Sequence, residues 1–194
     1  MQPFIDNARA FGARNAAGAG LARLAEGQSP QVLFITCSDS RVIPSLITGA
    51  GPGELFELRT AGNIVPPHDA GPTSEAATIE YAVSVLGVTD IVVCGHSHCG
   101  AVGALVRGDD LTAVPAVRDW LQHAADTPDG KQDDPAVADA VQHHVLAQLL
   151  RLRSYPCVQT ALEEGRISLH AWFYEVHTGG VLTHRSETDS FAAL

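Results

Sequence analysis

The sequence predicts an α/β fold in which a mainly parallel central β-sheet is flanked by helices. Short runs rich in apolar residues, at 31–36, 54–58 and 89–95, have the length of strands, and the first of them is β-branched. Segments with apolar spacing near 3.6 residues lie between and after these runs, as is typical of helices. Strands that alternate with helices indicate a parallel sheet with crossover connections.

The residues before the first strand are expected to form an appendage. Residues 1–27 are predicted to be two small helices joined by "NAAGAG" at 15–20, and these helices could pack on a neighbouring subunit. The polar stretch 124–135 is predicted to be a connector that is too short to divide domains. With 194 residues, the chain suits one full hydrophobic core. We therefore expect a single α/β domain over 1–194, with 1–27 as an N-terminal helical arm.

Helix and strand signals continue after the second strand. A helix is predicted over 73–87, because a Thr-Ser pair suited to capping begins it and a glycine ends it. A longer helix over 134–156 and a short one over 157–165 are predicted further on. The aromatic, alternating segment 168–176 and the segment 179–184, joined through a Gly-Gly turn, predict a C-terminal strand hairpin.

The charge balance limits the kinds of partner that the protein is expected to bind. The chain has 22 acidic and 12 basic residues, for a formal net charge of −10. Because no basic cluster stands out, nucleic acid and anionic membranes are disfavoured as partners. No apolar run has the length of a membrane span, and the first residues lack the apolar core of a signal peptide. We therefore expect a cytoplasmic enzyme or binding protein.

The four cysteines are too few to form a disulfide scaffold in a chain of this length. In a reducing compartment they are either small core residues or ligands of a metal or redox centre. Cys94 lies inside a predicted strand and Cys157 begins a predicted helix. We expect both of these to be core residues.

Metal-ligand residue types follow two of the predicted strands. Cys37 comes directly after the run 31–36, and His96 and Cys99 come directly after the run 89–95. If the two strands are neighbours in a parallel sheet, these three side chains meet at one edge. Two thiolates and one imidazole form a zinc site with one position open, as in catalytic zinc centres. The alternative is that both cysteines are buried core residues and that His96 caps a helix.

Two charged residues close to the first cysteine add to this hypothesis. In a locally extended chain, Cys37, Asp39 and Arg41 would point to the same side. Asp39 would then lie beside the metal, and Arg41 could hold its carboxylate through a bidentate pair. In the alternative interpretation Asp39 is a helix N-cap and Arg41 is a surface residue, which leaves the arginine without a purpose.

These motifs carry a family resemblance. The segment "CSDSRV" (37–42), followed downstream by "GHSHCGAV" (95–102), resembles the β-class carbonic anhydrases. The resemblance implies that Cys37, His96 and Cys99 hold one zinc ion per chain and that Asp39 and Arg41 form the family's catalytic dyad. It extends over roughly residues 25 to 105 and includes further matching segments, which are "GQSP" (27–30), "PGELFELRTAGNIVPP" (52–67) and "IEYAV" (79–83).

The same resemblance implies an activity and an assembly. The expected reaction is reversible hydration of carbon dioxide to bicarbonate and a proton. Gln28 is expected to reach substrate across a dimer interface, Phe56 and Tyr81 to line the substrate pocket, and Gly100 to follow the last ligand. A homodimer or a dimer of dimers is therefore expected.

One position departs from part of the family. Members with a non-catalytic bicarbonate site have a tryptophan three residues before the first cysteine, whereas this chain has Phe34, together with Arg59 and Tyr174 at the companion positions. The chain therefore resembles the subtype whose zinc is open and carries water. Two alternatives stay open: a carbonyl sulfide or carbon disulfide hydrolase on the same scaffold, and a non-catalytic zinc or redox sensor.

A proton must leave after each hydration, and a histidine could carry it. His98 lies between two predicted ligands and His68 follows "VPP", so either could lie near the site. The other histidines are expected to be surface or packing residues; they are His123, His143, His144, His170, His177 and His184.

Overall fold

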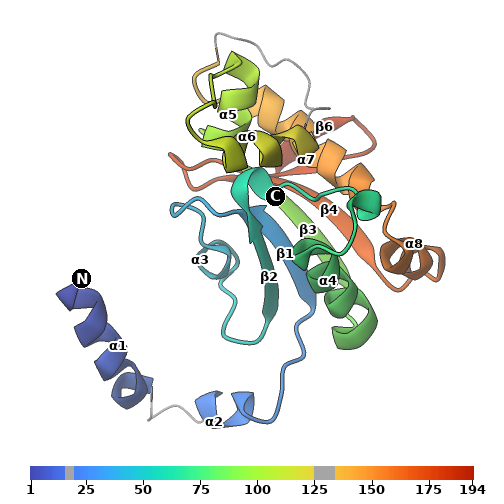
Figure 1. Ribbon diagram of the computed structural model, residues 1–194. Helices are drawn as coiled ribbons and strands as arrows, with labels where there is room; N and C mark the ends of the chain where they lie inside the picture. Colours follow the sequence, from blue (N-terminus) through green and yellow to red (C-terminus); the bar gives the residue numbers. More distant parts are fainter. Residues whose placement is uncertain (16–19, 125–133) are drawn as a thin grey trace.

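The architecture is a six-stranded sheet with helices packed on it (Figure 1). The computed structural model describes residues 1–15, 20–124 and 134–194. The strand order is β2-β1-β3-β4-β5-β6, in which the first four strands are parallel and the last two pair antiparallel. The strands are β1 (Val32–Cys37), β2 (Leu55–Thr60), β3 (Asp90–His96), β4 (Ser168–Tyr174), β5 (Val181–Arg185) and β6 (Ser190–Ala193). This confirms the predicted α/β class, the mainly parallel sheet and the C-terminal hairpin.

The helices match the predicted ones in part. They are α1 (Gln2–Asn15), α2 (Gly20–Leu24), α3 (Pro44–Thr48), α4 (Ser74–Glu80), the π-helix η3 (Tyr81–Leu86), α5 (Gly100–Arg107), α6 (Pro115–Leu121), α7 (Ala138–Leu152) and α8 (Pro156–Glu163). The described residues also include three short 3-10 turns: η1 (Ala61–Asn63), η2 (His68–Ala70) and η4 (Gln122–Ala124). The sequence did not predict α3, α5, α6 or β6, which are all short.

The start of α7 differs from the prediction for a local reason. Asp134 was expected to begin the helix, but its carboxylate accepts hydrogen bonds from the backbone N–H groups of Ala136 and Ala138, at 2.9 and 2.6 Å. These bonds close a turn in which Val137 has a φ of 48°. The regular helix therefore begins only at Ala138. Most of the predicted connector at 124–135, and the junction inside "NAAGAG", lie outside the described residues.

The main core lies between the sheet and the helices α4, α7 and α8. Alternate strand residues, such as Leu33 and Ile35 on β1 and Ile91 and Val93 on β3, are fully buried in it. Helix α7 packs directly on β3 and β4. This close packing needs Gly95, because a Cβ atom there would lie only 2.5 Å from the side chain of Val141.

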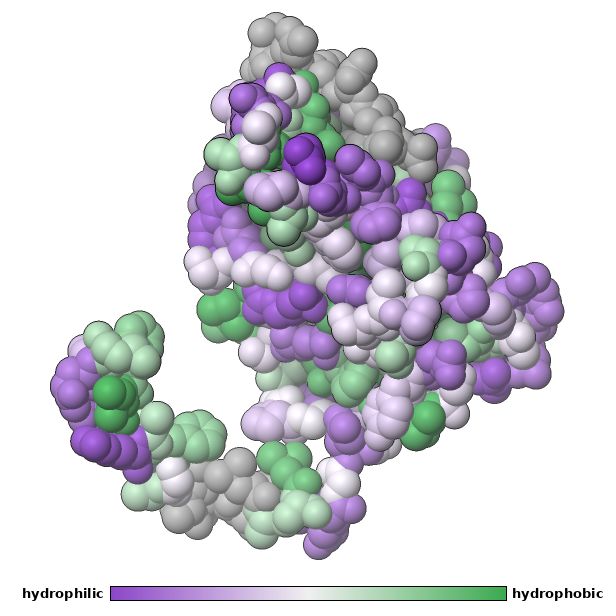
Figure 2. All heavy atoms as spheres, in the orientation of Figure 1, coloured by the Kyte–Doolittle hydropathy of each residue, from purple (hydrophilic) through white to green (hydrophobic). Residues whose placement is uncertain are grey.

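The N-terminal arm stands away from this body (Figure 1). Helix α1 exposes two phenylalanines, Phe4 at 73% and Phe11 at 52% of their surface. Figure 2 shows hydrophobic residues on the surface of the arm. Among the helices in the described ranges, none combines the length and the hydropathy needed to cross a membrane.

The packing at Gly95 leads to a first prediction. A Cβ atom at this position would lie 2.5 Å from Val141 Cγ1 and 2.6 Å from Val145 Cγ2. We expect Gly95→Ala to lower the free energy of unfolding by about 2 kcal/mol, because α7 must shift away from β3. Urea denaturation of the metal-free protein measures this. Gly12→Ala is the matched control, since no atom lies within 4 Å of its Cβ position. Equal stability of the two variants would contradict the prediction.

Candidate metal centre

The three predicted ligands meet at the carboxyl edge of the sheet. Strands β1 and β3 are parallel neighbours, so their last residues, Cys37 and His96, lie at the same edge of the sheet. Cys99 follows three residues later, at the N-cap position of α5. One sulfur or nitrogen ligand atom from each residue lies within 4.8 Å of the others. All three side chains are buried.

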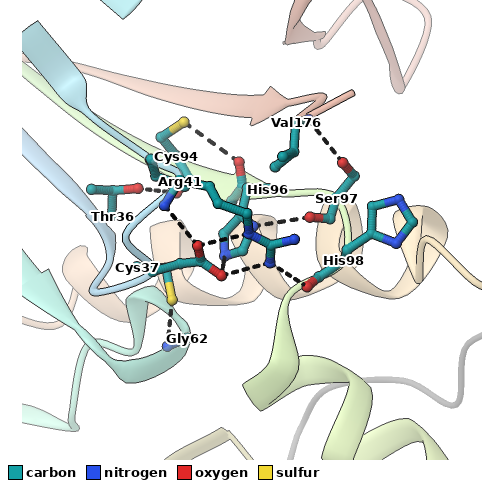
Figure 3. A network of polar contacts seen from close by, with 12 residues as sticks. Thr36, Cys37, Arg41, Gly62, Cys94, His96, Ser97, His98 and Val176 are labelled. Atoms are coloured by element: carbon teal, nitrogen blue, oxygen red, sulfur yellow. Dashed lines mark hydrogen bonds and ion pairs between the residues drawn. The ribbon is translucent and has the colours of Figure 1, made fainter. Parts of the chain in front are cut away.

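His96 is oriented to present a lone pair to this cluster. Its Nδ1 lies 3.0 Å from the carbonyl oxygen of Ser97, and this contact requires Nδ1 to carry the proton (Figure 3). Its Nε2 is therefore deprotonated when the imidazole is neutral. Within the described part of the chain, Nε2 has no hydrogen-bond partner although the side chain is 0% exposed. A buried acceptor without a donor is costly, and a metal ion would satisfy it.

The two cysteines influence each other, and their pKa values shift in opposite directions. The Cys99 thiol donates to Cys37, and this bond outweighs burial and lowers the pKa of Cys37 to about 4, with a further contribution from the Gly62 backbone N–H. The Gly62 N–H lies 3.3 Å from Cys37 Sγ. The same thiol–thiolate bond, together with burial, raises the pKa of Cys99. A divalent cation would stabilise the second thiolate, so the donor set fits zinc.

Asp39 and Arg41 form the expected pair, but by a different backbone route. Arg41 Nε and Nη2 donate to the two carboxylate oxygens of Asp39 at 2.9 and 2.7 Å. The predicted extended chain is wrong, because Val42 N–H donates to the Asp39 carbonyl at 3.0 Å and closes a turn. The N-cap of α3 is Ile43, so Asp39 does not cap that helix. Asp39 Oδ2 lies 3.8 Å from His96 Nε2, and thus faces the ligand cluster.

The backbone around the dyad is fixed from two sides. Arg41 Nη2 also donates to the carbonyl of His98 at 3.0 Å, which ties the two ligand loops together (Figure 3). Arg59 on β2 donates to the carbonyls of Cys37, Asp39 and Val42 at 3.0, 2.9 and 2.7 Å. Sequence reasoning missed this role of Arg59. No local signal in the sequence indicated it, because it depends on the parallel pairing that places Arg59 beside Thr36, next to Cys37.

The predicted substrate-pocket residues are divided between the two ends of the sheet. Gly100 begins α5 directly after Cys99. Phe56, in contrast, pairs with Leu33 at the start of the strands, about 13 Å along the sheet from the carboxyl ends. Its ring lies 6.0 Å from that of Tyr81, so these two residues are together. Gln28 is exposed and precedes β1. One chain therefore does not bring Gln28, Phe56 and Tyr81 to its own ligand cluster.

The residues around Phe34 lie on the opposite face of the sheet from the main core. Phe34 packs edge-on against Trp172, with ring centroids 5.8 Å apart. Tyr174 packs against the same small cluster. The aromatic substitution is thus accommodated within the fold, while the guanidinium of Arg59 is committed to the backbone of the dyad turn.

The candidate proton carriers have different surroundings. His68 stacks edge-on against Tyr155, with ring centroids 5.2 Å apart. The ring of His98 lies 6.2 Å from that of His177. His144, which was expected to be a surface or packing residue, is fully buried and its Nε2 lies 2.7 Å from the carbonyl oxygen of Gly62.

The dyad predicts how stability depends on pH. The side chain of Arg41 holds the pKa of the Asp39 carboxyl well below its usual range. In the unfolded chain this carboxyl protonates near pH 3.9. Its stabilising effect is therefore complete above about pH 5 and is lost as the pH falls below about 4. We expect metal-free Asp39→Asn to be less stable than wild type by about 1 kcal/mol between pH 5 and 8, since solvent screens the half-exposed Arg41.

Urea denaturation at pH values from about 3 to 8 measures the difference and its decrease on acidification. The control is Asp109→Asn, which removes the solvent-exposed pair between Arg107 and Asp109. We expect the control to change the free energy of unfolding little at any pH. A gap between wild type and Asp39→Asn that widens on acidification would contradict the assignment.

Comparison with known proteins agrees with this geometry. A family model described as carbonic anhydrase matches residues 32–181. A carbonic anhydrase of Pseudomonas aeruginosa is 51% identical over 164 residues, which cover 81% of this chain and 74% of that protein. A carbonic anhydrase of Synechococcus elongatus is 46% identical over 82% of this chain and 62% of its own length.

Solved structures show the same similarity. The β-carbonic anhydrase CcaA superposes with a TM-score of 0.92 at 38% identity, and the match covers 100% of this chain and 99% of that one. One of two tetrameric β-carbonic anhydrases from Sordaria macrospora superposes with a TM-score of 0.79 at 30% identity, over 94% of each chain. With a family model that spans most of the sheet and its ligand loops, the chain belongs to the β-class carbonic anhydrase family.

Proposed function

We propose that this protein catalyses the reversible hydration of carbon dioxide to bicarbonate and a proton, with one zinc ion held by Cys37, His96 and Cys99. The observation that carries the proposal is the buried Nε2 of His96, which lacks a hydrogen-bond partner among the described residues and faces two cysteine sulfurs. The hydrogen bond from Cys99 lowers the pKa of Cys37, which favours a thiolate at this position. Family membership supplies the reaction class.

A zinc ion bound by these residues would lower the pKa of a water molecule and thereby supply a hydroxide nucleophile near neutral pH. Two thiolates neutralise the charge of a divalent ion, so the surrounding residues must assist. Asp39 Oδ2 is placed to accept a hydrogen bond from the nucleophile, because it faces His96 Nε2 at 3.8 Å. Arg41 keeps that carboxylate ionised and aimed, through two hydrogen bonds.

We infer that the zinc site is of the open form. In this form Asp39 is paired with Arg41 and does not serve as a fourth ligand. Both carboxylate oxygens accept hydrogen bonds from Arg41, and Oδ1 also accepts from its backbone N–H at 2.9 Å. The same pairing speaks against a closed structural zinc site of the kind that a sensor would need.

We further propose that the substrate pocket is completed by a second copy of the chain. Gln28, Phe56 and Tyr81 lie at the other end of the sheet from their own ligand cluster, so they would serve the site of the partner subunit. This proposal extends to the organisation of the chain, in which residues 1–194 form one α/β domain and 1–27 is an arm that packs on the partner.

Carbon dioxide hydration by the zinc-loaded protein tests the function directly. We expect stopped-flow measurements to show hydration far above the uncatalysed rate, with about one zinc per chain. Cys37→Ala and Cys99→Ala should lose most of both zinc and activity, because each removes one of three protein ligands. Cys94→Ala is the matched control, since this buried cysteine lies on β3 outside the ligand cluster and burial raises its pKa to about 12.

Two outcomes would redirect the assignment. Full zinc retention in Cys37→Ala or Cys99→Ala would remove that residue from the site. Zinc binding with negligible carbon dioxide hydration would favour a sensor, or a carbonyl sulfide or carbon disulfide hydrolase. Hydrolysis assays with the two sulfur substrates separate these alternatives.

The assembly gives a further prediction. We expect a homodimer or a dimer of dimers, because the exposed phenylalanines of α1 need a partner surface. Phe4→Ser combined with Phe11→Ser should lower the molar mass by light scattering and reduce hydration together. Asn7→Ser, on the same helix, should leave both unchanged. A wild-type chain that is monomeric and fully active would show that the site is not shared.

A further inference from the structure

We infer that His144 is a positioning residue of the metal centre, which fixes the Gly62 turn so that the Gly62 N–H points at the sulfur of Cys37. The inference rests on the proposed zinc site and deepens it. His144 lies on α7, and nothing in the proposed reaction uses it directly.

A series of buried hydrogen bonds connects Cys37 to Val65 through Gly62, His144 and Gln148. Gly62 N–H donates to Cys37 Sγ at 3.3 Å, and the Gly62 carbonyl oxygen lies 2.7 Å from His144 Nε2. His144 Nδ1 lies 3.5 Å from Gln148 Nε2, while Gln148 Oε1 accepts from Val65 N–H at 2.8 Å. The side chains of His144 and Gln148 are 0% and 1% exposed. Water therefore does not compete for these groups.

The donor and acceptor roles along this series of hydrogen bonds are fixed at the end that is farthest from Cys37. The backbone N–H of Val65 can only donate, so the facing atom of Gln148 must be its carbonyl oxygen. The amide nitrogen of Gln148 then faces His144 Nδ1, which must act as the acceptor. His144 accordingly carries its proton on Nε2 and donates it to Gly62. Burial lowers the pKa of His144, which keeps the ring neutral and this tautomer in place.

Gly62 is the residue whose orientation matters. Its φ of 72° and ψ of 22° place it in the left-handed region, and a Cβ atom would lie 2.9 Å from that of Ala101. A glycine can leave this conformation more easily than other residues because it has no side chain to restrict it. The bond from His144 anchors the peptide group after Gly62 through its carbonyl and so restricts the backbone angles of the glycine that joins it to the peptide group facing Cys37.

The direction of the Gly62 N–H affects the electrostatics of the metal centre. An N–H group that points at a thiolate stabilises its charge and orients the sulfur toward the metal. Without His144, the turn would keep its contacts at Ala61 and Ile64, where Trp120 Nε1 and Thr60 Oγ1 donate to the carbonyls at 2.9 and 3.0 Å. The peptide group that carries the Gly62 N–H would stay tied at its Ala61 carbonyl, but the peptide group after Gly62 would no longer be held. The glycine between them could then change its backbone angles and turn the N–H away from the sulfur.

The test compares variants of the full-length zinc protein by chelator competition. His144→Leu removes the donor at similar volume, and we expect the zinc dissociation constant to rise about tenfold, the lower end of the range for groups outside the ligand shell. His144→Gln, whose amide nitrogen can take the place of Nε2, should restore most of the affinity. In the cobalt-substituted protein, His144→Leu should also shift the sulfur-to-cobalt charge-transfer band.

Leu152→Ala is the control for a general loss of stability, because Leu152 is fully buried at the end of the same helix. We expect it to lower the free energy of unfolding but to leave zinc affinity within about twofold. Wild-type affinity in His144→Leu would overturn the inference and leave the proposed function intact. A wild-type protein that binds no zinc would instead reject the proposed function.

A measurement on the wild type tests the inference if His144→Leu fails to fold. Long-range proton–nitrogen correlation NMR on the zinc-loaded protein reports which ring nitrogen of His144 carries the proton. We expect protonation at Nε2 alone. Protonation at Nδ1 would mean that His144 cannot donate to Gly62, and would overturn the inference.

Discussion

The parallel pairing of β1 with β3 is the constraint on which the rest of the site depends. It aligns Thr36 with Cys94 and thereby brings Cys37 and His96 out at the same edge of the sheet. A slip of one residue would turn Cys37 to the other face, toward Phe34 and its aromatic cluster. Hydrophobic burial of β1 and β3 on both faces makes such a slip costly, so the energy of the core fixes the geometry of the ligands.

At the carboxyl edge of the sheet, the buried groups and the half-exposed groups have different roles. The ligand atoms are removed from water, so solvent does not weaken their hydrogen bonds to the backbone N–H of Gly62 and the carbonyl of Ser97. Asp39 and Arg41 lie further out, with 17% and 46% of their side chains exposed. Arg59 links the buried ligand residues to the more exposed dyad, because it holds the backbone of both Cys37 and Asp39.

The position of the proposed pocket residues suggests a role for the N-terminal arm in assembly. A site whose ligands lie at one end of the sheet and whose pocket residues lie at the other is incomplete in one chain. The exposed phenylalanines of α1 would cost free energy in an isolated chain, whereas burial against a second copy would stabilise both the arm and the assembly. In this proposal, catalysis and oligomerisation depend on the same contact.

The sequence by itself determined the strand runs, the α/β class and the ligand triad, because apolar periodicity and the residues at strand ends are local signals. It also paired Asp39 with Arg41, although through an extended chain that is in fact a turn. Only the tertiary structure decided what crosses long sequence separations. Arg59 reaches the dyad turn across neighbouring strands, and His144 reaches Gly62 from a helix 82 residues away. Such contacts depend on how the helices and strands pack, and no local pattern of residues encodes that.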